Sequence, residues 1–125
     1  MRPLDSVYHV QIPVTDLTAA IKWYVDHLGF AETWPATDRH AFLGLPHGPF
    51  LMMWRTEDPE RANFTIDGET FPVVLFGTRR IHDLRKNLMD AGVPITQFQD
   101  EGTHWILKFL DPDGNMLGVI QDSNQ

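Results

Sequence analysis

The feature that most constrains the fold of this chain is an internal repeat. The second half of the sequence repeats the first as strand, helix and then short strands, and one helix cannot cover both faces of a four-stranded sheet. The repeat therefore predicts an α+β fold, in which two β-α-β-β-β modules pair and curl around a shared cleft. The matching residues are Val10, Ile12, Val14, Leu17, Ala20 and Tyr24 in the first copy and Val74, Phe76, Thr78, Ile81, Leu84 and Leu88 in the second.

The first module is expected to span about residues 1–55. In residues 8–14, apolar side chains alternate with His9, Gln11 and Pro13, which predicts a strand with one apolar face and one face carrying an imidazole and an amide. Asp16 or Thr15 is a suitable N-cap for the amphipathic helix that follows, and Gly29 is its expected end. The remaining strands of this module are predicted at 30–34, 41–45 and 50–55.

A change in composition separates the two copies. Residues 56–70 are acidic and contain Pro59 and Gly68, so we interpret them as a surface linker. The second module is then expected over about 71–125, all within one domain of this size. Its predicted elements are a strand at 71–78, a helix from Ile81 to Ala91, and strands near 96–99, 103–110 and 116–121.

Charge and composition exclude several kinds of partner. The 17 acidic and 10 basic residues give a net charge of −7, which argues against binding nucleic acid or an anionic membrane surface. The chain has no cysteine, so a disulfide framework and a thiolate metal site are both impossible. The N-terminal residues lack the apolar core of a signal peptide, and no apolar run reaches transmembrane length. We therefore expect a cytoplasmic protein.

Several short motifs follow one another in a characteristic order along both copies. They are residues 9–17 (HVQIPVTDL), Trp23-Tyr24, 28–30 (LGF), 91–93 (AGV) and 109–115 (FLDPDGN). Together they resemble the vicinal oxygen chelate superfamily, which includes glyoxalase I, bleomycin- and fosfomycin-resistance proteins, methylmalonyl-CoA epimerase and extradiol dioxygenases. The resemblance covers nearly the whole chain apart from the linker. It implies that the paired modules form an open half-barrel cleft, and in the metalloenzymes of the family a divalent cation held in that cleft.

The resemblance also implies where metal ligands would lie, namely on the first and last strand of each module. These positions correspond to His9, to Leu51 or Met52, to about Val73, and to Gly118. Of these side chains, only the imidazole of His9 is a ligand for a hard divalent cation, whereas catalytic sites use about three protein ligands. We therefore expect no metal, no cofactor and no glyoxalase-type activity.

Other side chains could supply donors in place of the missing ones. His40, His104 and Glu101 are the candidates, but they lie at strand ends and turns. We accordingly expect no second nitrogen or carboxylate oxygen within coordinating distance of the His9 ring. His9 itself has two open interpretations, an acid–base or ligand-binding group and a cleft-lining histidine that bonds a neighbour.

The predicted strands carry unusually many large, soft side chains. Strand alternation cannot place all of them under the helices, so some should line the cleft, where methionine and tryptophan favour flat apolar ligands. Gly118, in place of the family's glutamate, is expected to leave extra room. The expected ligand-binding residues are His9, Gln11, Met52, Trp54, Trp105, Phe109, Met116 and Gly118.

The sequence leaves three functional hypotheses. The first is a metal-free protein that binds a fairly apolar or aromatic small molecule, similar in type to the bleomycin-resistance branch. The second is a metal-dependent lyase, isomerase or dioxygenase with non-standard ligands. The third is a regulatory or immunity-type binding domain with a protein partner. In each case the resemblance implies a homodimer. A basic run, Arg79-Arg80 with Arg85-Lys86, could bind an anion or form a solvated helix face.

Overall fold

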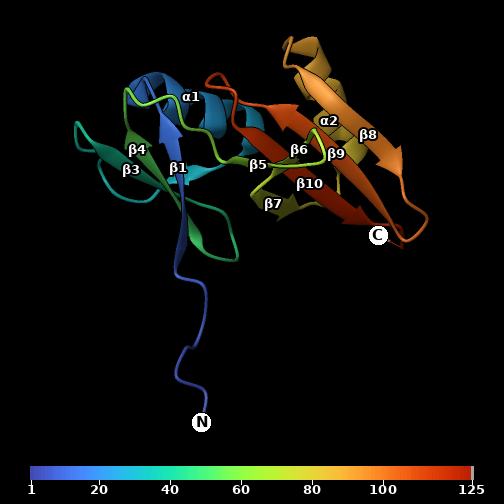
Figure 1. Ribbon diagram of the computed structural model, residues 1–125, viewed down its shortest axis with the longest axis horizontal. Coiled ribbons are helices and arrows are strands. Elements are labelled where there is room, and N and C mark those ends of the chain that lie inside the picture. Colours follow the sequence, from blue (N-terminus) through green and yellow to red (C-terminus); the bar gives the residue numbers. More distant parts are fainter. Residues whose placement is uncertain (125) are drawn as a thin grey trace. The chain divides into compact units, whose positions relative to one another are not determined.

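The computed structural model describes residues 1–124, and the chain divides into two compact units, residues 1–59 and residues 60 onward. Each unit contains one β-α-β-β-β module, with its helix on one face of an open four-stranded sheet (Figure 1). The predicted α+β class and the repeat of the β-α-β-β-β module are therefore confirmed. None of the described helices is long and apolar enough to span a bilayer.

The first unit is built on a sheet with the strand order β1-β4-β3-β2. Its helix begins where predicted, because the Asp16 side chain accepts a hydrogen bond from the Ala19 amide at 3.0 Å, and it ends at Gly29, whose φ of 79° is left-handed. The elements of this unit are β1 (His9–Val14), α1 (Leu17–Leu28), β2 (Ala31–Glu32), β3 (His40–Gly44) and β4 (Phe50–Arg55).

Strand β4 was apolar on both faces in the sequence, and its register decides which side chains meet the helix. Leu51 and Met53 are fully buried together with Ile12 of β1 and Leu43 of β3. This buried side, which we call the helix face, packs against the α1 residues Leu17, Ala20 and Tyr24. Met52 points to the opposite side, which we call the open face.

The second unit repeats this plan with the strand order β7-β10-β9-β8. Strands β7 and β10 are parallel, as are β1 and β4 in the first unit. The elements of the module are β7 (Val74–Gly77), α2 (Ile81–Asp90), β8 (Ile95–Asp100), β9 (His104–Leu110) and β10 (Met116–Asp122).

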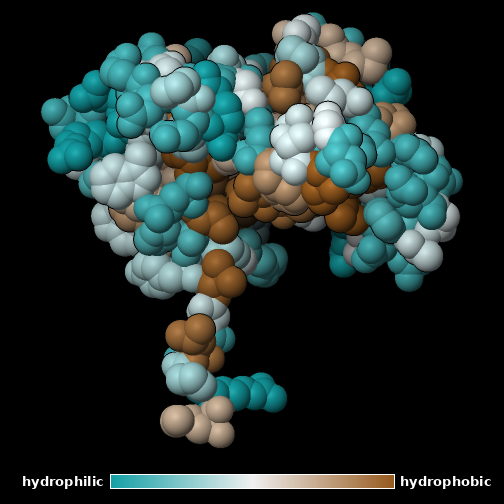
Figure 2. Space-filling view, in the orientation of Figure 1, coloured by the Kyte–Doolittle hydropathy of each residue, from teal (hydrophilic) through white to brown (hydrophobic). Residues whose placement is uncertain are grey.

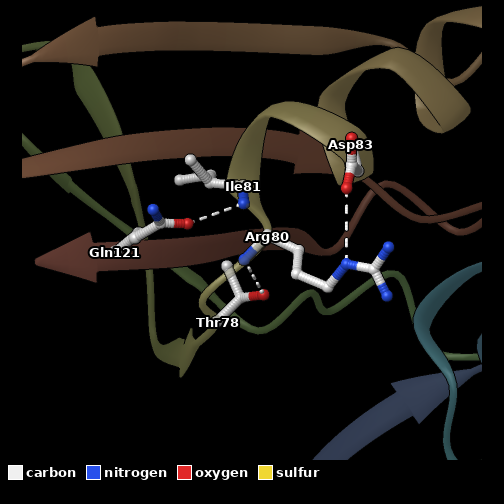
Figure 3. Close-up of polar contacts among 5 residues, drawn as sticks. All are labelled: Thr78, Arg80, Ile81, Asp83 and Gln121. Atoms are coloured by element: carbon white, nitrogen blue, oxygen red, sulfur yellow. Dashed lines mark hydrogen bonds and ion pairs between the residues drawn. The ribbon is translucent and has the colours of Figure 1, made fainter. Parts of the chain in front are cut away.

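Helix α2 starts without a side-chain cap from its own N-cap residue, Arg80. Instead, the buried Gln121 of β10 accepts a hydrogen bond from the Ile81 amide at 2.8 Å, and Thr78 accepts one from the Arg80 amide (Figure 3). The Arg80 side chain pairs with Asp83 one turn later, on the exposed surface. The first turn of α2 is thus fixed to its own sheet by the strand it covers.

Part of the expected linker is a β-hairpin in the structure. Strands β5 (Asn63–Ile66) and β6 (Glu69–Pro72) pair antiparallel around a turn in which Asp67 and Gly68 both have positive φ. Asn115 accepts a hydrogen bond from the Ala62 amide at 2.8 Å, and Asn63 accepts one from the Met116 amide at 2.7 Å. These bonds attach the hairpin to the start of β10.

Candidate functional site

The open face of the first module is formed by the side chains that alternate with its core. Strand pairing aligns them in rows across β1, β4 and β3, with Gln11 beside Met52 and Met52 beside Phe42. A neighbouring row contains Trp54 beside His40. His9 and Gln11 lie on this face, opposite the buried Ile12, as strand alternation predicted.

An aromatic pocket of about 270 Å³ lies on the first module. The rings in its wall meet edge-to-face: Trp34 lies 5.6 Å from Phe42 and 5.5 Å from Phe50, between ring centroids. Phe42 and Phe50 meet in the same way at 6.5 Å. An edge-to-face contact covers one face of only one of the two rings, so a flat molecule can stack on a face that remains uncovered. The pocket is lined by Tyr8, Trp34, Pro35, His40, Phe42 and Phe50.

His9 lies at the edge of this pocket and carries an unsatisfied polar atom. Its ring contacts two residues of the pocket wall, Tyr8 at 5.5 Å and Phe42 at 5.8 Å. The Nδ1 atom is buried and has no hydrogen-bond partner among residues 1–124. A buried polar atom without a partner costs about 1–3 kcal/mol. The neighbouring residue that was expected to form a hydrogen bond with His9 is therefore not found at Nδ1 among the described residues.

Gln11 is oriented by a hydrogen bond from the adjacent strand. The indole Nε1 of Trp54 lies 2.6 Å from the Gln11 Oε1. An indole N–H can only donate, so the Gln11 atom that faces it must be the carbonyl oxygen. The amide nitrogen of Gln11 then points away as a donor, and no described residue accepts from it. His40 packs against the same indole, with 5.0 Å between the ring centroids, and also lines the aromatic pocket.

The open face of the second module is built differently. A Cβ added at Gly118 would lie 2.9 Å from Leu75 Cδ2 and 3.0 Å from Pro72 Cγ. The expectation that Gly118 leaves extra room is therefore wrong, because neighbouring apolar side chains already fill that space. Figure 2 shows apolar residues gathered over the strands of this module. Val73 and Leu75 of this module are 56% and 47% exposed.

Two of the expected ligand-binding residues lie on the helix face of the second module. Phe109 is fully buried in the core. Trp105 packs against His82 of α2 at 4.8 Å and stacks on Phe98 at 5.1 Å. Met116 is on the open face by alternation with Gly118, but it too is buried. The structure thus groups His9, Gln11, Met52 and Trp54 in the first module, and the second-module residues do not form a single row with one another.

The remaining candidates from the sequence have structural or surface positions. His104 starts β9 and its Nδ1 lies 2.9 Å from the Thr103 hydroxyl. Glu101 is exposed in the turn before it. In the basic run, Lys86 pairs with Asp90 on the surface and Arg85 lies over the Phe98 ring at 4.5 Å. His40 alone among these candidates lines the aromatic pocket.

The residues missed from the sequence are the aromatic ones of the pocket wall. Tyr8, Trp34, Phe42 and Phe50 were placed in predicted strands, without a ligand-binding role. For Phe42 the signal was present, because it alternates with the apolar Ala41 and Leu43 and so had to face the open side. Trp34 had no such signal, since it follows a two-residue strand in an irregular segment.

Comparison with known proteins agrees with this architecture. The model of the glyoxalase/bleomycin resistance protein/dioxygenase superfamily matches residues 6–119, which is nearly the whole chain. The chain belongs to this superfamily. No curated protein sequence gives a significant match.

Solved structures of superfamily members share the fold over almost their full lengths. A putative glyoxalase family protein from Bacillus anthracis superimposes with a TM-score of 0.78 at 14% identity, covering 98% of this chain and 100% of that one. A genomically encoded fosfomycin resistance protein from Listeria monocytogenes gives 0.76 at 12%, covering 96% and 95%. A lactoylglutathione lyase from Agrobacterium tumefaciens gives 0.73 at 16%, covering 96% of each chain. Identities this low establish the fold alone.

The residues at the superfamily's metal positions do not fit a divalent cation. The register resolves the fourth-strand position as Met52, because Leu51 faces the core. The second-module positions hold Gly118 and Val73, neither of which has a donor side chain. Hard divalent cations need several oxygen or imidazole ligands, and His9 supplies one. Among the described residues no group of three or more His, Asp or Glu side chains could hold a metal ion.

Proposed function

We propose that this superfamily member binds a small planar aromatic molecule in the pocket of its first module, without a metal and without chemical conversion. The observation that carries the proposal is the pocket wall, in which the rings meet edge-to-face. The volume, about 270 Å³, is near the lower limit of ligand pockets, which hold about 300–1,000 Å³. A molecule of one or two fused rings suits that space.

Two polar groups on the same open face as the pocket give the ligand an orientation. The Gln11 amide nitrogen is a donor held outward by Trp54, and the buried His9 Nδ1 lacks a partner. A ligand with one carbonyl or hydroxyl group would satisfy one of them, while its rings stack on the aromatic wall. The metal-dependent alternative has less support, because three of the four metal positions lack a donor side chain.

The test uses a neutral two-ring probe, 2-naphthamide, and isothermal titration calorimetry. Phe42→Ala removes the ring that contacts both Trp34 and Phe50, so we expect it to weaken binding at least about tenfold, since stacking on one aromatic ring contributes about 0.5–1.5 kcal/mol beyond its buried area. Phe98→Ala is the matched control, because it removes a ring of similar exposure in the second module.

Binding should be unchanged after treatment with EDTA. Equal affinity of the wild-type protein and Phe42→Ala would refute the assignment to this pocket. Failure of 2-naphthamide and of other one- and two-ring compounds to bind would refute the proposed function.

A further inference from the structure

The second module contains a lysine that neither its fold nor the proposed function explains. Lys108 lies in the middle of β9 on the open face, between Gln97 of β8 and Gly118 of β10. It is 6% exposed, although lysine is among the residues least often buried. Its alternating neighbours Leu107 and Phe109 are in the core, so the lysine side chain is directed to the opposite side of the sheet.

The ammonium group of Lys108 has an aromatic partner and no anionic one. Its Nζ lies 4.7 Å from the centre of the Phe71 ring, and Phe71 is stacked on Phe64 at 5.5 Å. Among residues 1–124, no carboxylate is within ion-pair distance of this nitrogen. The nearest carboxylate along the same face of β10 is that of Asp122, four residues beyond Gly118 and exposed.

This arrangement leaves a charge only partly compensated. Desolvating an ammonium group costs several kcal/mol, whereas a cation–π contact returns about 0.5–2 kcal/mol. An apolar side chain of similar length would avoid the cost. The chain has a net charge of −7, yet none of its 17 acidic residues is placed against this nitrogen. A positive charge held without a counterion is suited to an anion that arrives from outside.

The surroundings define what kind of anion fits. Val73 and Leu75 expose apolar surface beside Gly118. Leu75 and Pro72 fill the space that a side chain at position 118 would occupy. We propose that Lys108 is an anion-binding residue on the open face of the second module, and that it binds the carboxylate of an otherwise apolar small molecule. The same ammonium group would repel a divalent cation near Gly118, so this face accepts an anion where the family's metalloenzymes hold a cation.

The experiment compares two probes of the same shape and different charge, 2-naphthoate and 2-naphthamide, by isothermal titration calorimetry. The wild-type protein should bind the carboxylate about tenfold more tightly or better, as expected for a charge-assisted hydrogen bond. Lys108→Met should abolish this preference and leave the affinity for the amide unchanged. Lys108→Arg retains the charge and should retain the preference.

Lys86→Met is the matched control, because it removes the same charge from an exposed lysine paired with Asp90. It should keep the preference for the carboxylate. Methyl resonances of Val73 and Leu75 should shift on adding 2-naphthoate to the wild-type protein and not to Lys108→Met. Absence of a preference in the wild-type protein, or its persistence in Lys108→Met, would overturn the proposal. Neither outcome bears on the binding of the neutral probe by the first module.

Discussion

The two modules share one face and differ on the other. On the helix faces, equivalent register positions hold apolar residues in both copies: Leu51 corresponds to Leu117, and Leu43 to Phe109. On the open faces, the row Gln11–Met52–Phe42 of the first module corresponds to Leu75–Gly118–Lys108 in the second. A hydrogen-bonding amide, a thioether and an aromatic ring are replaced by an aliphatic side chain, a glycine and a cation.

The difference follows from what each face must satisfy. A helix face must be buried and tightly packed, so few residue types are suitable there. An open face has no such requirement, and its side chains can differ without loss of the fold. The aromatic contacts reflect the same contrast: rings meet edge-to-face in the pocket of the first module, whereas in the second unit the ring beside the open-face Lys108, that of Phe71, is stacked on Phe64 at 15°. The open faces therefore contain the features that distinguish the modules.

The largest effect should come from truncating the shared core. Phe109→Ala removes a fully buried ring, and such substitutions cost about 3–5 kcal/mol. Phe42→Ala removes the same ring from a half-buried open-face position and should lower the free energy of unfolding by less. Urea denaturation followed by far-ultraviolet circular dichroism measures both values. Equal losses would contradict the distinction between the two faces.

A smaller effect is expected from the glycine that replaces Met52 in the repeat. Gly118→Ala places a methyl group 2.9 Å from Leu75 Cδ2 and 3.0 Å from Pro72 Cγ, and such overpacking costs about 1–3 kcal/mol. Gly77→Ala on the neighbouring strand is the control, since no heavy atom lies within 4 Å of its added Cβ. Thermal unfolding should show a lower midpoint for Gly118→Ala and an unchanged or slightly higher one for Gly77→Ala. An unchanged midpoint for Gly118→Ala would mean that Leu75 moves away at no cost and the site can open.

The helix faces could be predicted from the sequence because their signal is periodic. The caps at Asp16 and Gly29, the strand at 50–55 and the alignment of the two copies all follow from local chemistry and spacing. In the strand HWILKFL, alternation also assigns each side chain to a face of the sheet. Lys108 marks one face of this strand, and alternation then places Trp105 and Phe109 on the other. They were nevertheless expected in the cleft on account of their size.

Other parts of the site depended on contacts between distant segments. The β5–β6 hairpin formed where an acidic linker was expected, because Asn63 and Asn115 bond the backbone of residues more than fifty positions away. The pocket wall likewise joins Trp34, from an irregular segment, with rings from β3 and β4. No local pattern encodes such pairings, and they determine both open faces.

The smallest effect should come from the polar pair that distinguishes the first open face. Trp54 donates to Gln11 at 2.6 Å, whereas the corresponding residues of the second module, Ile120 and Leu75, cannot hydrogen-bond through their side chains. Trp54→Phe should lower the free energy of unfolding by about 0.5–1 kcal/mol, because an exposed hydrogen bond contributes little. Trp105→Phe is the control, since no described residue accepts from its indole nitrogen. The more sensitive measurement is the side-chain amide resonance of Gln11, which should shift in Trp54→Phe and not in Trp105→Phe.

Without the Trp54 indole, the Gln11 amide can turn over, and its carbonyl oxygen can face the ligand as readily as its nitrogen. Trp54→Phe should therefore lose selectivity between hydrogen-bond acceptors and donors on a two-ring ligand, with little loss of overall affinity. Retained selectivity would show that His9, rather than Gln11, orients the ligand.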